Sequence, residues 1–189
     1  MSCASASACT AVGDAVPGVG SPETLVERWD GERWSIQPSP TPHGYAELEG
    51  VSCASTRTCT AVGIAWPRTG QRMPVAERWH GATWSTQRLP TRSDAPDSGL
   101  NDVSCASANA CTAVGWALTP DLLADAPPRV VRWNGLRWSD QSAPNPHGGV
   151  ELEGVSCPSL TACKAVGIGA HGPGVAENWD ALGWSVDPG

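Results

Sequence analysis

Two short stretches recur along the chain and decide its fold. The first reads VSCASTRTCTAVG from Val51 to Gly63, and the second reads ERWHGATWS from Glu77 to Ser85. Similar copies of the first begin at Ser2, Val103 and Val155, and similar copies of the second begin at Glu27, Val131 and Glu177. Four copies at a fixed period indicate stacked structural units, and roughly 40 to 50 residues is the usual length of a four-stranded propeller blade.

The composition favours an all-β chain. The 189 residues include 21 Gly, 17 Pro and 10 Trp but no Phe, and long blocks of charged helix formers are missing. Turn residues at this density interrupt helices and separate short strands. We therefore expect one β-propeller domain over residues 1–189, with four blades of four antiparallel strands at about residues 1–43, 44–94, 95–147 and 148–189. The alternative is half of a larger propeller, such as an eight-blade ring made by two chains.

The second copy shows where the strands of one blade should lie. An inner strand is followed by a small polar turn at residues 54–58, and the third and fourth strands are joined by His80-Gly81. The matching turns Asp30-Gly31 and Asn134-Gly135 lie between paired Trp residues, which indicates a tight hairpin. In the fourth copy the cue becomes Asp180 to Gly183, so that turn is expected to differ. The four predicted strands are residues 47–53, 59–64, 75–79 and 83–87.

These motifs resemble those of a known group of proteins. The repeated VSC…CTAVG unit is similar to the repeats of secreted actinobacterial propeller-like proteins, and the WDGxxW hairpin resembles the Asp-box hairpins of some propellers. The resemblance covers nearly the whole chain. It implies blades and a secreted protein, and it implies no particular activity.

The eight cysteines form four pairs with five residues between the members of each pair. If each pair flanks the turn between the first two strands of a blade, its members lie opposite each other and a disulfide needs little adjustment. Zinc is a weaker interpretation, because structural zinc sites usually combine two clusters with spacings of roughly two to four residues. Reduced thiols are the remaining alternative. We expect disulfides, and hence an oxidising compartment, with the pairs Cys3 and Cys9, Cys53 and Cys59, Cys105 and Cys111, and Cys157 and Cys163.

Length variation between the copies is confined to two kinds of segment. One joins the second strand to the third, and the other links the fourth strand to the next blade. In an up-and-down blade both segments emerge on the same side, so one rim should carry variable loops on a rigid scaffold. Trp66, Trp116 and Tyr45 interrupt the repeat on this rim. Each could stack on a sugar ring, or could instead pack within the protein.

Two links before the second and fourth copies are nearly alike, and each contains His and Glu. His43 and Glu49 lie in the first of them, and His147 and Glu153 lie in the second. In a closed four-blade ring these residues could converge on the mouth of the central channel and hold a cation such as calcium. Inherited repeat identity with a solvated acidic rim is the simpler interpretation, so no cofactor is predicted.

The expected function is a binding or interaction module that takes a glycan or another small ligand on the variable rim. The alternatives are a glycoside hydrolase or lyase that uses rim carboxylates such as Glu49 and Glu153, and a purely structural scaffold. The sequence contains no GxSxG, HExxH, phosphate-loop or dinucleotide-binding motif. No catalytic residue is therefore predicted, and a binding protein is favoured over an enzyme.

Charge and hydropathy argue against nucleic acid and membranes as partners. The formal net charge is −7 and Lys and Arg are not clustered, which disfavours nucleic acid and anionic membranes. No apolar run reaches the roughly 18 residues of a membrane span, and residues 1–13 lack the basic and apolar regions of a signal peptide. We expect a secreted or extracellular protein, monomeric or homodimeric, whose signal peptide is not in this sequence.

Overall fold

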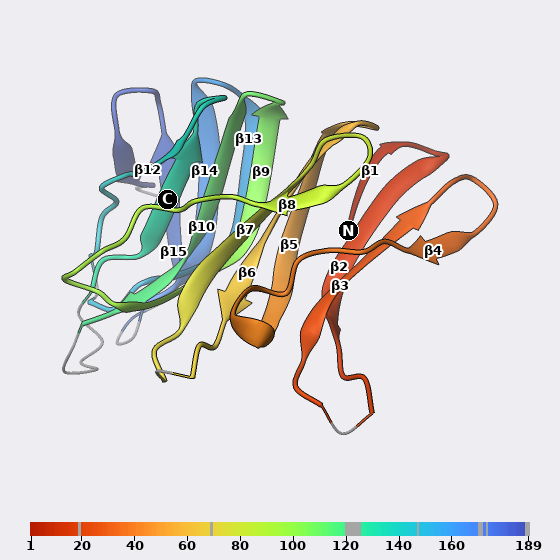
Figure 1. The fold of residues 1–189 in the computed structure, drawn as a ribbon. Helices are drawn as coiled ribbons and strands as arrows, with labels where there is room; N and C mark the ends of the chain where they lie inside the picture. Colours follow the sequence, from red (N-terminus) through yellow and green to blue (C-terminus); the bar gives the residue numbers. More distant parts are fainter. Residues whose placement is uncertain are drawn as a thin grey trace.

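A computed structural model describes residues 1–18, 20–68, 70–119, 126–146, 148–169, 172 and 174–187. These residues form four antiparallel sheets, each built from four strands in chain order (Figure 1). The all-β prediction is confirmed. The first sheet contains β1 (Ser2–Ser5), β2 (Ala8–Ala15), β3 (Glu23–Trp29) and β4 (Trp34–Ile36). A short 3₁₀ turn, η1 (Pro42–Gly44), leads to the second sheet, which contains β5 (Ala46–Ser55), β6 (Thr58–Ala65), β7 (Met73–Trp79) and β8 (Trp84–Thr86).

The third and fourth sheets repeat this order. The third contains β9 (Asp97–Ser107), β10 (Ala110–Leu118), β11 (Arg129–Trp133) and β12 (Trp138–Asp140). The fourth contains β13 (Glu151–Ser159), β14 (Ala162–Ile168), β15 (Gly174–Trp179) and β16 (Trp184–Val186). The boundaries of the four blades that the sequence predicts inside one domain remain a prediction.

Each cysteine pair forms a disulfide across the hairpin of the first two strands. In the second sheet Cys53 lies opposite Cys59, and pairing continues to Ser55 opposite Thr58. The connecting turn is therefore shorter than predicted, because the ladder extends beyond the disulfide. All four predicted pairs are confirmed, with Cα atoms 3.9 to 4.1 Å apart, and no cysteine is free among the described residues.

The glycine of the repeated Ala-Val-Gly motif is required by a close approach of two strands. The pairing of β5 with β6 shifts between Leu48 and Gly50. This shift brings the Glu47 carbonyl oxygen to 2.0 Å from the position that a Cβ atom of Gly63 would occupy. At Gly13 of the first sheet, nothing lies within 4 Å, because β1 is too short to reach it. Glycine is therefore required at this position only in sheets whose first strand is long enough to lie against it.

The Trp pairs face each other across the last hairpin of each sheet. Trp79 lies opposite Trp84 with ring centroids 5.9 Å apart. The turn between them places Gly81 at a φ of 86°, and in the fourth sheet Ala181 takes the same place at a φ of 73°. The Asp180 carboxylate accepts two backbone N–H groups there, as the side chain at that position does in the first and third sheets. The fourth turn therefore keeps the common geometry, and the expected difference is wrong.

The core lies between consecutive sheets. Val62 on β6 is 0% exposed and belongs to one apolar cluster with Leu100 and Trp138 of the third sheet. A polar contact accompanies it, because the Cys105 amide donates to the Ser52 hydroxyl at 3.0 Å. Equivalent hydrogen bonds join Cys53 to Ser2 and Cys157 to Ser104. At each interface an Arg also stacks on a Trp of the next sheet, in the pairs Arg28 and Trp79, Arg78 and Trp133, and Arg132 and Trp179.

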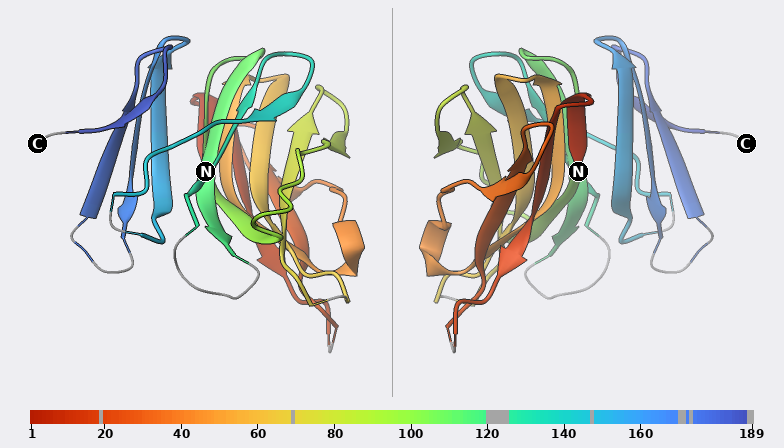
Figure 2. Two further views of the ribbon diagram at one scale, coloured as in Figure 1. Left: turned by 90° about the vertical axis from the view of Figure 1, so that its left-hand side faces the viewer. Right: turned by 90° about the vertical axis from the view of Figure 1, so that its right-hand side faces the viewer.

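The four sheets form an open arc within the described residues. Their extensive contacts join the first sheet to the second, the second to the third and the third to the fourth. Figure 1 shows the N-terminal and C-terminal sheets at opposite ends of the arc, and Figure 2 shows the last sheet to one side of the other three. Exposure agrees with this arrangement. Val166 is 55% exposed although the equivalent Val62 and Val114 are buried, and Trp34 is 42% exposed although Trp84 is 5% exposed.

Candidate functional site

The aromatic residues predicted as ligand contacts are engaged with other protein groups. Tyr45 and Trp66 stack on each other, with ring centroids 4.6 Å apart and planes 19° from parallel. The Trp66 amide donates to the Tyr45 carbonyl oxygen at 3.0 Å. Both side chains are half-buried, and each ring has one face stacked against the other ring. They join the link before β5 to the end of β6, which fixes the base of the rim.

Trp116 is covered by a cation. The Arg72 guanidinium lies 4.2 Å from the centroid of the Trp116 ring. Asp97 holds this Arg72 in place, because its two carboxylate oxygens accept from Nε at 2.9 Å and from Nη2 at 3.1 Å. The arrangement joins the second and third sheets across the rim. Direct ligand roles for Trp66, Trp116 and Tyr45 stay predictions.

The carboxylates of the inner strands gather at the mouth of the arc. Burial raises the pKa of Glu153, and the charges of Glu151 and Glu49 raise it further. Burial, followed by the charge of Glu49, raises the pKa of Glu47 to about 7. Carboxylates that influence each other in this way lie in one region, although Glu49 and Glu153 come from different sheets.

A metal role for this region stays a prediction. Within the part of the chain that the structure describes, no three His, Cys, Asp or Glu residues are placed to hold a metal ion. His147, which the sequence predicts beside Glu153, lies outside the described residues. Calcium binding at the mouth therefore has no support from the geometry.

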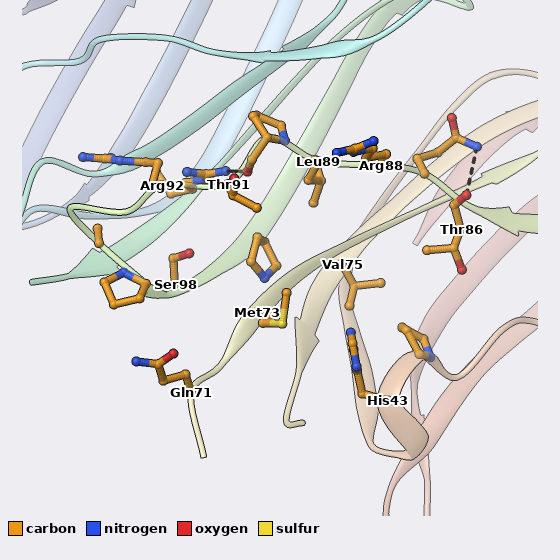
Figure 3. Close-up of a pocket in the computed structure, with 17 residues that line it drawn as sticks. His43, Gln71, Met73, Val75, Thr86, Arg88, Leu89, Thr91, Arg92 and Ser98 are labelled. Carbon is orange, nitrogen blue, oxygen red and sulfur yellow. Dashed lines mark hydrogen bonds between the residues drawn. The ribbon is translucent and has the colours of Figure 1, made fainter. Parts of the chain in front are cut away.

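His43 lies at the edge of a cavity on the rim. The cavity has a volume of about 440 Å³ and lies between the outer strands of the second sheet and the link to the third (Figure 3). His43 is exposed and has a φ of 63°, and its side chain lies on the far side of the cavity from Arg88 and Arg92 (Figure 3). A non-glycine residue in this left-handed region is uncommon and is a frequent feature of binding loops. Of the predicted site residues that the structure describes, His43 is the one that lines this cavity.

The cavity has an apolar floor and a basic wall. Met73, Val75 and Leu89 supply apolar surface, and Figure 3 shows Met73 and Val75 below the link and Leu89 on it, next to Arg88. Arg88, Arg92 and Arg129 supply three guanidinium groups, and no Asp or Glu of the described residues lines the cavity. The whole chain has only 12 Lys and Arg against 19 Asp and Glu. Three guanidinium groups therefore line one cavity of a chain in which acidic residues outnumber basic ones.

Sequence reasoning missed these arginines. The link that contains Arg88 and Arg92 is the longest of the three that join a second Trp to the next Cys, and this length was a usable signal. Arg129 begins β11 at the position that Leu25, Val75 and Val175 occupy in the other repeats, so an Arg in place of an apolar residue was the signal there. The fold brings it to the link, where its Nη2 donates to the Pro90 carbonyl oxygen.

The fold is similar to that of solved β-propellers. A structure of YCF48 bound to D1 peptide has a TM-score of 0.58 at 13% identity, over 98% of this chain and 51% of that chain. The six-bladed fucose-binding lectin of Aleuria aurantia has a TM-score of 0.51 at 11% identity, over 97% of this chain and 64% of the lectin. The same lectin in complex with alpha-methyl-L-fucoside gives the same score and identity.

No family model and no curated protein matches the sequence. The chain spans about half of the YCF48 protein and less than two thirds of the lectin. At these identities the likeness concerns the fold alone. The chain is thus an all-β protein made of propeller-like four-stranded sheets.

Proposed function

We propose that this chain is a disulfide-stapled propeller module that binds a glycan on its variable rim. The observation that carries the proposal is the 440 Å³ cavity at the point where loops of variable length meet. Concave sites of this kind on rigid scaffolds are the usual places for small ligands. The likeness to a lectin solved with a fucoside supports a sugar as the first ligand class to test. The likeness to a protein solved with a peptide makes a peptide the second class.

The proposal includes an extracellular location. Four disulfides within one small chain are typical of proteins in an oxidising compartment, which supports this location. No helix in the described ranges is long and apolar enough to cross a membrane. The resemblance of the repeats to those of secreted actinobacterial propeller-like proteins agrees with secretion and remains part of the proposal.

The proposal also includes a ring with more than four blades. The first and last sheets do not pack extensively on each other within the described residues, as they would in a closed ring of four. Nearly the whole of this chain matches part of a six-bladed propeller. This match supports an arc that curves like part of a larger ring. An eight-blade ring made by two copies is one such arrangement, and further repeats in a longer chain are another.

A glycoside hydrolase or lyase that uses Glu49 and Glu153 is the second candidate. The observation that favours it is the raised pKa of Glu153 beside the charge of Glu49, because glycoside hydrolysis pairs a protonated carboxyl with an ionised one. Cleavage of a retained glycan that is lost in Glu49→Gln/Glu153→Gln would establish this activity. Intact glycan after incubation would leave the binding function alone.

A glycan array with the oxidised chain tests the binding proposal. The wild type should retain at least one glycan. The variant His43→Ala/Gln71→Ala should lose at least tenfold of that signal, because both side chains are exposed polar groups at the cavity. His80→Ala is the matched control, since His80 is exposed in a hairpin turn away from the cavity lining. Retention of no glycan by the wild type would refute the proposed function.

A further inference from the structure

The arginine wall of the rim cavity points to the charge of its ligand. Two of the three guanidinium groups already have acidic partners outside the lining. Arg92 Nη2 lies 2.7 Å from Asp94, and Arg129 Nη1 lies 3.0 Å from Asp140. Arg88 is exposed and has no ion-pair partner among the described residues. The unbalanced positive charge at the cavity is therefore that of Arg88.

Arg129 supplies a second, independent sign of an absent anion. Its side chain is only 1% exposed, and its Nε has no hydrogen-bond acceptor. A buried guanidinium donor without an acceptor costs free energy, and burial lowers the pKa of Arg129. Asp140 is a single carboxylate at one end of this group, so it leaves the Nε side uncompensated. A negative charge in the cavity would offset this cost.

The remaining lining limits the kind of anion. Met73, Val75 and Leu89 form an apolar floor, and four prolines add rigid apolar surface beside it. A fully hydrated ion such as phosphate would gain nothing from this floor. A carboxylate attached to a compact body with an apolar face would contact both the floor and the arginines.

We propose that the rim cavity binds a carboxylate-bearing ligand, with the carboxylate beside Arg88 and the apolar face of the ligand on Met73, Val75 and Leu89. This inference rests on the proposed function only for the place of the site. It adds that the preferred glycan is acidic, as in a uronic acid residue. A non-sugar organic acid has the same chemistry, so the experiment separates the two sources.

The test is an NMR titration of the ¹⁵N-labelled, oxidised full chain with four probes. Methyl glucuronide and methyl glucoside differ in the carboxylate of a sugar, and benzoate and benzamide differ in the carboxylate of a non-sugar ring. Acidic probes should shift the amides of Met73 and Leu89 and should bind at least tenfold more tightly than their neutral counterparts. Added salt should weaken this binding, because the attraction is electrostatic.

Two substitutions locate the effect. Arg88→Gln should weaken the binding of the preferred acidic probe at least tenfold, because it removes a charged donor. Arg57→Gln is the matched control, since Arg57 is also exposed, forms no ion pair in the described ranges and does not line the cavity. It should change the dissociation constant less than twofold.

Each outcome decides the proposal. Preference for glucuronide supports an acidic glycan, and preference for benzoate alone supports the carboxylate site while it argues against a sugar. Equal binding of methyl glucoside and methyl glucuronide would overturn the inference and leave glycan binding intact. Binding of none of the probes at these amides, or an Arg88→Gln chain that binds like the wild type, would also overturn it.

Discussion

Glu77 and Glu177 are fully buried carboxyl groups. Each is 0% exposed, and within the described part of the chain neither has a hydrogen bond to its carboxylate oxygens. Burial raises the pKa of Glu77 to about 8 and that of Glu177 to about 7. The third repeat has Val131 at the same place, and this side chain is equally buried. The fold therefore accepts an apolar residue of similar volume at this position.

We expect Glu77→Val to stabilise the protein, and to do so increasingly as pH rises. The folded-state pKa of Glu77 lies above its unfolded value of 4.5, so the unfolded chain releases this proton first. Wild-type stability should therefore fall between about pH 4.5 and pH 8. A shift of this size corresponds to at most about 5 kcal/mol. Urea unfolding of both proteins at several pH values measures the difference.

Glu27→Val provides the control for this experiment. Glu27 has the same place in the first sheet but is only half-buried, so its replacement should change the pH dependence little. A Glu77→Val advantage that is the same at pH 4.5 and pH 8 would contradict the assigned cause. At this scale the sequence predicted the cysteine pairing but not these carboxyl groups, because Glu at position 77 resembles the half-exposed Glu27 in every local cue.

At the scale of a single element, the Trp hairpin of the fourth sheet contains an avoidable strain. Ala181 has a φ of 73°, whereas glycine has the equivalent place at 103°, 86° and 93° in the other three turns. A side chain in this left-handed region costs roughly 1 kcal/mol or more. We expect Ala181→Gly to raise the free energy of unfolding, because it removes this strain. The net gain should be only about 0.5 to 1 kcal/mol, since glycine also adds some entropy to the unfolded chain.

Thermal unfolding of the oxidised protein measures this effect, and Gly81→Ala tests it in the opposite direction. A Cβ atom at Gly81 would contact the flexible end of Arg57 at 3.1 Å, so the backbone strain should dominate the loss of stability. An Ala181→Gly midpoint equal to or below that of the wild type would show that the turn is not strained.

Strand positions were largely predictable because each strand is bounded by a motif of its own. The predicted and observed strands of the second sheet differ by one or two residues at their ends. The larger discrepancy is the turn after Cys53, where backbone pairing continues to Ser55. Local sequence signals the presence of a turn, but the length of the ladder depends on how two strands meet.

The whole molecule has two open faces that differ in character. On the first sheet Trp34 is exposed, although the equivalent Trp of each other sheet is buried. On the last sheet, Lys164 and Asn178 replace the Thr and Arg that contact the next sheet elsewhere, whereas Val166 remains. Lys164 instead forms an ion pair with Asp187 at 2.9 Å. Apolar attraction between the two faces is therefore retained, and the specific polar contacts are lost.

We expect weak head-to-tail association of two copies through these faces. Light scattering on the oxidised protein should show a mass that rises with concentration from one chain toward two. Val166→Arg should hold the mass at one chain, because it places a charge on the joining face. Leu182→Arg is the control, since Leu182 is 94% exposed in a hairpin turn. A wild-type mass of one chain at all concentrations would refute this expectation.

Neither the ring nor the cavity could be derived from the repeats alone. The number of copies suggested a closed ring of four, but closure depends on the angle between packed sheets, which no single repeat encodes. The cavity depends on a link, a strand edge and Arg129 of the next sheet, and these meet only after the sheets pack. His43 was identified because it lies in one of two nearly identical links, whereas Arg88 and Arg92 lie in a link without such a counterpart.

The hydrogen bonds from a cysteine amide to a serine of the preceding sheet connect only neighbours. Because the described sheets contact each other extensively only in sequence, the chain is a linear array whose folding energy is approximately a sum of sheet and interface contributions. Every interface shares these amide–serine hydrogen bonds and the stacking of an Arg on a Trp, which come from the same two motifs. Duplication or deletion of one whole repeat within a gene would therefore recreate a working junction at once, so the number of blades can change over evolution without any new interface having to arise.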